Sequence, residues 1–361
     1  MRQTRLAILS RLLAALALGA VVGAAFGQSL PTWNGSFTDQ NHGKPYPFTM
    51  VGGDPSSTGT TPVSVYVIPV KVTFSTTTCQ SGQSIFDPTQ PSSNGISAVN
   101  NVLRSPLFTA INGFPEGSGG AVQYIDAFQR GNFWGAVQQN GNVYHLVLAP
   151  SAPVAEQTIL VPAADGAALD DPTVPRQYGG CIGAVALTFL DDQLGSLLVP
   201  LLQQQQIQPS GLAMFVLYDV FYGYDSAGWY PIGAGLHTVA YGVAPGGPQT
   251  WLWAAYNDGA CMFNGLPLCL YQDVDDFSHE LAEWADDPFA HTAAPCGLLE
   301  VGDPLLGLET AAYYTYIGTN GTAYHLQDLV FLPYFGAAAN TSYNGQTTFQ
   351  GEALTYCEYG G

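Results

Sequence analysis

The sequence predicts a mixed α+β fold built from a mixed sheet, a backing helix and a second helix that carries the main motif. Residues 187–205 have the length and apolar spacing of a long helix, bent at Pro200. Residues 273–286 predict a shorter amphipathic helix that Pro288 ends. Runs rich in β-branched and aromatic residues predict strands at 63–74, 212–220, 237–243 and 250–256.

The N-terminal half gives weaker patterns. Residues 28–60 are rich in Gly, Pro, Ser and Thr without a sustained period, which predicts an extended leader or linker. Pro69 indicates that the strand at 63–74 lies at an edge or carries a bulge. A helix is expected at about 97–107, and residues 121–149 read as a strand-rich stretch. The folded domain is therefore expected to span 61–361, and its motif-bearing core about 181–310.

The first 27 residues have the pattern of a secretory signal peptide. Arg2, Arg5 and Arg11 precede an apolar run at 12–26, and small residues stand before Gln28. The apolar run is shorter than the roughly 20 residues that a membrane helix needs, and no later segment is long enough. We therefore expect a secreted protein, extracellular or periplasmic, that keeps no membrane anchor after cleavage.

The charge of the chain excludes some partners. It has 27 acidic and 8 basic residues, and a formal net charge of −19. Three of the basic residues lie in the predicted signal peptide, so five remain against 27 acidic residues, a formal charge of −22. Nucleic acid and anionic membrane surfaces would repel such a chain and are not expected partners.

Six cysteines lie beyond the predicted signal peptide, at positions 79, 181, 261, 269, 296 and 357. An even number in an exported chain predicts disulfides, and we expect at least two. Cys261 and Cys269 are the most plausible local pair, because the residues at 264–267 can form a turn between them. The other pairings stay open.

The segment FSHELAEWADDP at 277–288 is the most informative stretch of the chain. His279 and Glu283 stand four residues apart, on one face of a helix, and Glu280 follows the histidine. In the H-E-x-x-H motif of zinc hydrolases, two side chains at this spacing hold the metal and the intervening acid acts on its water. Here Glu283 replaces the second histidine, and a carboxylate still ligates zinc at about 2.0–2.2 Å.

An amphipathic helix with a solvated acidic face would give the same pattern. Val274, Phe277, Leu281, Trp284 and Ala285 form one apolar stripe, and the acidic residues lie roughly opposite. The order of elements, however, resembles that of the upper domain of zinc hydrolases and implies a zincin-like fold. The metal site and the solvated face therefore remain alternatives.

Further ligands must come from beyond this helix. Glu300 is the first candidate, because its distance along the chain from Glu283 is similar to that of the downstream Glu in zinc hydrolases. The less certain candidates are Asp287, His291 and Asp303. Glu300 and Asp303 could instead cap backbone amides in a tight turn at Gly302. His237 is interpreted as a core histidine in preference to an accessory group, and no G-x-S-x-G or P-loop motif occurs.

Three segments of the C-terminal part stand out: SHELAE at 278–283 with Asp287 and Pro288 after it, LEVGD at 299–303, and 321–330. They resemble the EXORDIUM or phosphate-induced family of secreted proteins and its bacterial and fungal relatives. The stretch at 124–134 is similar to the bacterial members. The chain departs from the family at Pro304, where relatives have Leu before a Cys, and at Cys296, which lies upstream of the motif. The resemblance implies a secreted or wall-associated protein and does not by itself imply an enzyme.

Two functions follow from these patterns. The first is a secreted, metal-dependent hydrolase, most plausibly peptidase-like, with zinc held by His279, Glu283 and Glu300 and with Glu280 as general base. The alternative is a non-enzymatic secreted or cell-wall-associated protein of the EXORDIUM type, with a structural or degenerate metal site that holds zinc or calcium. A peptide or a cell-wall polymer is the expected partner in either case.

Overall fold

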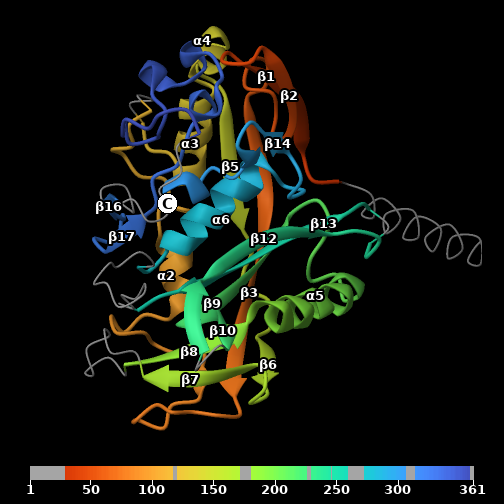
Figure 1. The fold of residues 1–361 in the computed structure, drawn as a ribbon, viewed down its shortest axis with the longest axis vertical. Helices are drawn as coiled ribbons and strands as arrows, with labels where there is room; N and C mark the ends of the chain where they lie inside the picture. Colours follow the sequence, from red (N-terminus) through yellow and green to blue (C-terminus); the bar gives the residue numbers. More distant parts are fainter. Residues whose placement is uncertain are drawn as a thin grey trace, which may run out of the picture.

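The computed structural model describes residues 29–116, 120–170, 180–225, 229–244, 246–258, 272–305 and 314–357 (Figure 1). The predicted signal peptide and the predicted Cys261–Cys269 pair lie outside these residues. The fold is a mixed α+β fold, as the sequence predicts.

A mixed seven-stranded sheet forms the centre of the molecule, around β3 (Thr60–Phe74). Parallel to β3 run β5 (His145–Pro150), β6 (Gln157–Val161) and β9 (Leu212–Tyr218). Next to β9 lies parallel β13 (Gln249–Tyr256), and antiparallel β12 (Gly235–Ala240) forms the edge beside it. The short strand β4 (Ile85–Phe86) pairs antiparallel with the far end of β3.

Helices cover both faces of this sheet (Figure 1). Alternate residues of β9 point to opposite sides, so that Met214 packs in one core and Phe215 in the other. The first core also contains apolar residues of α2 (Ala98–Arg104), α3 (Tyr124–Asn132) and α6 (Asp275–Asp286). The second core contains one face of α5 (Leu187–Gln203). Strands buried on both faces explain the continuous apolar runs in the sequence.

Smaller sheets surround the main one. A four-stranded sheet has the order β11 (Trp229–Gly233), β10 (Val220–Asp225), β8 (Cys181–Ala186) and β7 (Gly166–Asp170). Three two-stranded sheets consist of β1 (Thr32–Asp39) with β2 (Lys44–Val51), β14 (Ala293–Ala294) with β15 (Gly297–Leu298), and β16 (Tyr314–Ile317) with β17 (Ala323–Leu326). Short 3₁₀ turns lie at Asp303–Leu305, Leu332–Phe335, Ala339–Thr341 and Tyr343–Gly345.

The predicted helices α2, α5 and α6 are confirmed, with α2 shorter than expected. Ser97 caps α2 by accepting a hydrogen bond from the amide of Asn100, and α5 continues through Pro200. The four predicted strands are also confirmed. Pro69 lies inside the sheet, but the pairing of β3 with β5 ends at Val65 and the pairing with β6 begins at Val70. Pro69 therefore lies between the segment of β3 that pairs with β5 and the segment that pairs with β6. Its missing amide hydrogen costs no ladder bond with either strand.

The prediction of an extended leader at 28–60 is wrong for most of that stretch. It contains the β1–β2 hairpin, whose side chains Phe37, Tyr46, Phe48 and Met50 are buried in the first core. Buried and exposed residues alternate along much of β2, and both of its prolines are exposed. A two-stranded sheet has free edges that tolerate proline, so proline there does not exclude a strand.

The prediction of a strand-rich stretch at 121–149 is also wrong for its first half. This part forms α3 and then α4 (Trp134–Gln139), and only the last residues form β5. All nine residues of α3 are buried, although Asp126, Gln129, Arg130 and Asn132 are polar. Its helical period extends over only nine residues, which is shorter than the window in which pattern distinguishes a helix from a strand.

Two disulfides confirm the expectation of at least two. Cys79 is bonded to Cys181, and Cys296 to Cys357. Such bonds are typical of proteins that function outside the cytoplasm. Among the helices of the described residues, none has the length and apolarity required to cross a membrane.

Candidate metal centre

Helix α6 carries the motif and lies across one face of the main sheet (Figure 1). Its apolar stripe enters the first core through Phe277, Leu281 and Trp284. The whole helix is buried, including its acidic side, so the alternative of a solvated acidic face is wrong. Full burial of each large apolar side chain contributes about 1.5–3 kcal/mol, which helps to offset the cost of burying the acids.

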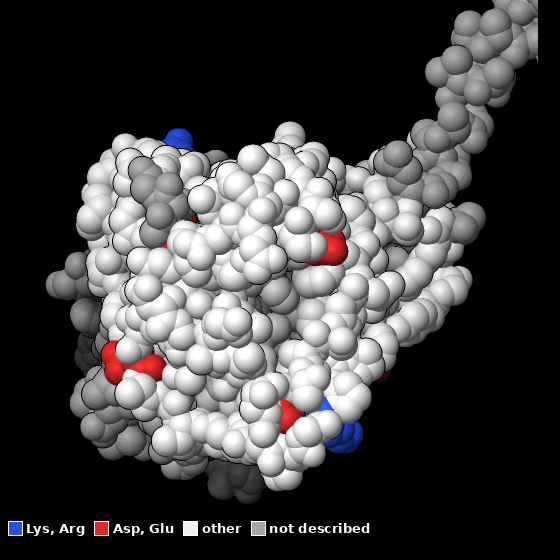
Figure 2. All heavy atoms as spheres, turned by 90° about the horizontal axis from the view of Figure 1, so that it is seen from above, with Lys and Arg blue, Asp and Glu red and all other residues white. Residues whose placement is uncertain are grey.

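Buried acids are a general property of this protein. Eleven carboxylates of the described residues are buried, six of them in α6 or directly after it: Asp275, Asp276, Glu280, Glu283, Asp286 and Asp287. Figure 2 shows one outer face of the molecule, on which few charged side chains lie. Many of the acidic side chains therefore lie inside the fold, where their negative charge must be compensated.

Three of the predicted side chains meet at the end of α6. Nε2 of His279 lies 3.0 Å from Oε2 of Glu283 and 3.7 Å from Oδ1 of Asp303. The candidate ligand atoms of these three residues all lie within 4.8 Å of one another. The side chain of Asp303 is 49% exposed, so this group opens to solvent on one side. His279 and Glu283 have the i, i+4 arrangement that the sequence predicts, and Asp303 adds a third candidate ligand.

The backbone of the loop after β15 fixes Glu283. Its Oε1 accepts hydrogen bonds from the amides of Gly302 and Asp303, at 3.0 Å and 3.3 Å. Its other oxygen, Oε2, faces the imidazoles. The turn at Gly302 thus donates to a helix carboxylate, whereas the sequence suggested that Glu300 and Asp303 cap the turn themselves.

A second group forms around His237, which comes from the edge strand β12. Its Nδ1 lies 3.2 Å from Oε2 of Glu280 and 3.5 Å from Oε2 of Glu283. Its Nε2 lies 3.9 Å from Oε2 of Glu300. The structure therefore places Glu300 beside His237 rather than beside His279. His237 is buried, as a core histidine would be, but its neighbours are three carboxylates.

Gln327, which directly follows β17, orients the first histidine. Its Oε1 accepts a hydrogen bond from Nδ1 of His279 at 2.7 Å, and its Nε2 donates to the carbonyl oxygen of Gly302 at 2.8 Å. Its backbone amide donates to the hydroxyl of Ser278 at 2.9 Å. Because Nδ1 of His279 donates to Gln327, Nε2 is the nitrogen that faces Glu283 and the one that would bind a metal ion.

Burial and proximity shift the pKa values in this cluster. Burial alone would lower the pKa values of His237 and His279, but the neighbouring carboxylates hold both well above their usual value. Burial alone would raise the pKa of Glu283, but the two imidazoles hold it well below its usual range. Burial raises the pKa of Glu280, and burial with the charge of Glu283 raises that of Glu300 to about 9. Clusters of shifted groups in a cleft are typical of functional sites.

The cluster lines a cleft of about 420 Å³ between β12 and α6. Its walls include the backbone of β12 and the side chains of Tyr222, Asp276 and Leu298. Two glycines allow close approach: a Cβ on Gly302 would clash with the ring of His279, and one on Gly235 would lie 2.6 Å from Cγ and Oε1 of Glu280. The space next to the histidine and the acid is therefore filled by backbone.

The structure separates the other two candidates from the cluster. Asp287 accepts hydrogen bonds from the amide and hydroxyl of Thr292, so it closes the turn after α6. His291 is exposed, and its Nδ1 pairs with the carbonyl oxygen of Phe289. Sequence reasoning missed Gln327 as a member of the site, and it preferred a core role for His237 to the accessory role. The sequence signal of both is a polar residue at a buried position in or directly after a strand.

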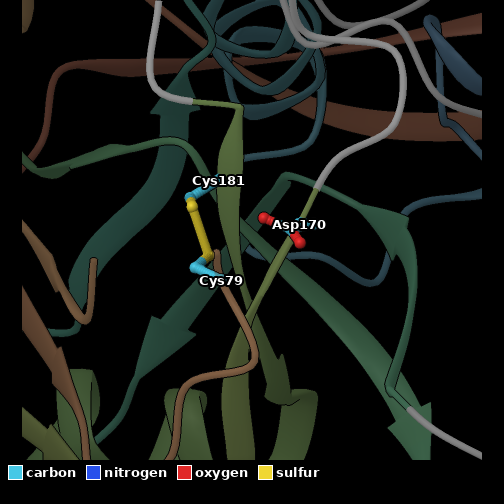
Figure 3. A group of neighbouring side chains, drawn as sticks. All are labelled: Cys79, Asp170 and Cys181. Atoms are coloured by element: carbon cyan, nitrogen blue, oxygen red, sulfur yellow. A yellow bond between two sulfur atoms is a disulfide. The ribbon is translucent and has the colours of Figure 1, made fainter. Parts of the chain in front are cut away.

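A third group of possible ligands, Cys79, Asp170 and Cys181, lies at the four-stranded sheet (Figure 3). The two sulfur atoms are bonded to each other, as the figure shows. A disulfide has no thiolate to offer a metal ion. We therefore interpret this group as a structural cross-link and not as a metal site.

Comparisons of the chain with protein-family models, with curated proteins and with solved structures give no match.

Proposed function

We propose that this protein is a secreted, metal-dependent hydrolase that acts on peptides. The main observation in support is the convergence of two imidazoles and four carboxylates on one cleft, with Nε2 of His279 only 3.0 Å from Oε2 of Glu283. His279, Glu283 and Asp303 would hold a zinc ion, with Glu300 as a neighbour of this set. Secretion is supported by the N-terminal sequence pattern and by the disulfides.

The donor atoms have the spacing that a metal ion requires. Ligands at about 2.0–2.2 Å from a tetrahedral ion lie roughly 3.3–3.6 Å from one another. The separations of 3.0 Å and 3.7 Å around His279 are close to that range. In addition, Nε2 of His237 and Oε2 of Glu300 are buried and have no hydrogen-bond partner among the described residues. The mixture of imidazole and carboxylate fits zinc better than calcium, which prefers oxygen ligands only.

The residues of the cleft have distinct parts in the proposed reaction. A bound zinc ion supplies Lewis acidity and lowers the pKa of a coordinated water. Glu280, which follows the first ligand, accepts the proton of the attacking water and donates it to the leaving amine. His237 donates a hydrogen bond to Oε2 of Glu280 and so orients this carboxylate. Gly235 leaves room for Glu280 at the cleft wall.

The edge strand β12 supports a peptide as the substrate. In the described part of the chain, β12 pairs with β13 alone, and its other side borders the cleft. An extended peptide can add to such an edge through main-chain hydrogen bonds. Its scissile bond would then lie next to His237 and across the cleft from Glu280. A wall polymer without amide groups could not form this ladder.

Metal content tests the site directly. The wild-type protein, dialysed against zinc and then against buffer, should retain zinc in elemental analysis. His279→Ala should retain less, because the remaining ligands of its position cannot complete the coordination shell. His291→Ala is the matched control, since that histidine is exposed and lies outside the cluster, and it should retain the wild-type content. Equal zinc in all three proteins, or none in any, would refute the site.

Catalysis needs a separate experiment. Digests of a broad peptide library at acid and neutral pH should show cleavage by the wild type, and Glu280→Gln should lower turnover about 10²-fold or more while zinc stays bound. A zinc-containing wild type whose digests equal those of Glu280→Gln would favour the alternative, a non-enzymatic secreted protein with a structural metal site.

A further inference from the structure

The ligand atoms around α6 form two groups rather than one. Within the described residues, His279, Glu283 and Asp303 make one set of mutually close donors, and His237, Glu280 and Glu283 make another. Glu283 alone belongs to both, and no such set contains both imidazoles. Two donors on opposite sides of one ion can be separated by at most about 4.4 Å, twice a metal–oxygen bond. One ion therefore cannot bind both histidines as they stand.

The shared carboxylate lies between the two groups. Oε2 of Glu283 is 3.0 Å from Nε2 of His279 and 3.5 Å from Nδ1 of His237. A carboxylate in this position can bridge two ions, and bridged pairs in hydrolases have ions about 3.5–4 Å apart. The hydrogen bonds from Gly302 and Asp303 to Oε1 keep Glu283 in place.

The charge of the fully ionised cluster matches two dications. Glu280, Glu283, Glu300 and Asp303 carry four negative charges once metal ions have displaced their protons, and histidines that ligate a metal ion are neutral. One divalent ion leaves two of these charges to be balanced by protons, whereas two divalent ions neutralise the set. The nearest side chains add no positive charge, since the remaining titratable groups of the cleft wall are Asp276 and Tyr222.

The other nitrogen of His237 has the environment of a metal-bound imidazole. His237 is 6% exposed, and its Nε2 has no hydrogen-bond partner among the described residues. Oε2 of Glu300 lies 3.9 Å from Nε2 and is placed to accept its hydrogen when Nδ1 binds an ion. A buried imidazole with carboxylates near both of its nitrogens has the neighbours of a ligand and not those of a core residue.

We propose that the cleft binds two divalent transition-metal ions, bridged by Glu283: one with His279 and Asp303, the other with Nδ1 of His237 and with Glu280. This inference rests on the proposed function only in that the first ion is bound. Glu280 then ligates the second ion when both positions are filled, and it is free to act as a base when the first alone is filled.

Equilibrium dialysis with zinc, followed by elemental analysis, measures the stoichiometry. We expect two zinc ions per chain in the wild type and one in His237→Ala or Glu280→Gln. Glu283→Gln should retain fewer than one, because both positions use it, and the control His291→Ala should keep two. Each variant is compared only if its thermal unfolding is cooperative.

Manganese gives a second measurement that needs no variant. At two Mn²⁺ ions per chain, electron paramagnetic resonance of the wild type should show the broadened spectrum of a coupled pair in place of the six lines of an isolated ion. One zinc per chain with an isolated-ion spectrum would overturn the second site and leave the proposed function standing. No bound metal would overturn both. Two ions in both the wild type and His237→Ala would place the second ion elsewhere and overturn the assignment.

Discussion

Oε1 of Gln327 accepts a hydrogen bond from Nδ1 of His279 at 2.7 Å. The same side chain donates to the carbonyl oxygen of Gly302, and its backbone is bonded to Ser278 of α6. One residue therefore joins the motif helix, the segment after β17 and the loop that carries Glu300 and Asp303. Because partners of this kind set the tautomer and the orientation of a metal-bound histidine, Gln327 is a positioning residue of the proposed centre.

Replacement of Gln327 should weaken metal binding without removing any ligand. In Gln327→Leu, Nδ1 of His279 loses its acceptor, and we expect zinc affinity to fall about 10–100-fold in a competition titration with a chromophoric chelator. Gln327→Glu keeps an acceptor oxygen and should retain most of the affinity. If both variants bind zinc as the wild type does, Gln327 has no part in positioning the histidine.

The two close glycines allow a steric test. Gly302→Ala would drive a Cβ into the ring of His279, and Gly235→Ala would drive one into the carboxylate of Glu280. The first change should lower zinc affinity at least about tenfold, whereas the second should lower turnover and leave the ion of His279 bound. Both effects are measurable on the same protein samples.

Gly195→Ala is the matched control for these variants. Gly195 lies within α5, and the nearest atom to a new Cβ, Cζ2 of Trp251, would be 4.0 Å away. Alanine is the better helix former by about 1 kcal/mol, so this variant should be slightly more stable and should bind zinc normally. Wild-type zinc affinity in Gly302→Ala would contradict the packing of His279 against the loop.

The sequence predicted the core of the fold because the elements of the main sheet have strong local patterns. The strand β3 is rich in β-branched residues, β9 and most of β13 are continuous apolar runs, and α6 shows a clear apolar stripe. The β1–β2 hairpin and α3 were missed for different reasons. Prolines on exposed positions obscured the alternation of β2, and the helical period of α3 extends over only nine residues.

The candidate site was predictable only where its residues are close in sequence. His279, Glu280 and Glu283 lie within two turns of one helix, so spacing alone places them together. His237 reaches them because β12 pairs antiparallel with β13 and thereby returns along the edge of the sheet to α6. Gln327 arrives from a segment that follows β17. Both contacts depend on the tertiary arrangement, and no local pattern in the sequence predicts them.

The buried acids predict a stability that falls as pH rises. Burial raises the pKa of Asp286 from 3.8 to about 7, although Gln129 and Asn132 donate hydrogen bonds to its carboxylate. Between these two values the folded protein holds a proton that the unfolded chain has released. The free energy of unfolding therefore decreases from about pH 4 to pH 7 and levels off above, where both states are ionised.

Asp286→Asn should remove the part of this decrease in the free energy of unfolding that comes from Asp286. Urea unfolding of the metal-free protein, in EDTA at several pH values, should give a shallower slope for the variant than for the wild type. A shift of this size corresponds to at most about 4 kcal/mol over the window. Asp192→Asn, on the exposed side of α5, should leave the slope unchanged. A steeper slope for Asp286→Asn would contradict a protonated Asp286 in the fold.

The disulfide between Cys296 and Cys357 should support both stability and the metal centre. Cys296 lies between β14 and β15, directly before the loop that carries Glu300 and Asp303, and the bond closes a separation of 61 residues. Replacing both cysteines by serine should cost about 4 kcal/mol in urea unfolding, on the chain-entropy estimate. The freed loop should also weaken zinc binding.

The matched control replaces Cys79 and Cys181, whose bond closes 102 residues and lies at the four-stranded sheet. That variant should lose a similar free energy of unfolding but bind zinc with unchanged affinity. Equal zinc affinity in the two double variants would show that the loop holds its ligands without the help of the Cys296–Cys357 bond.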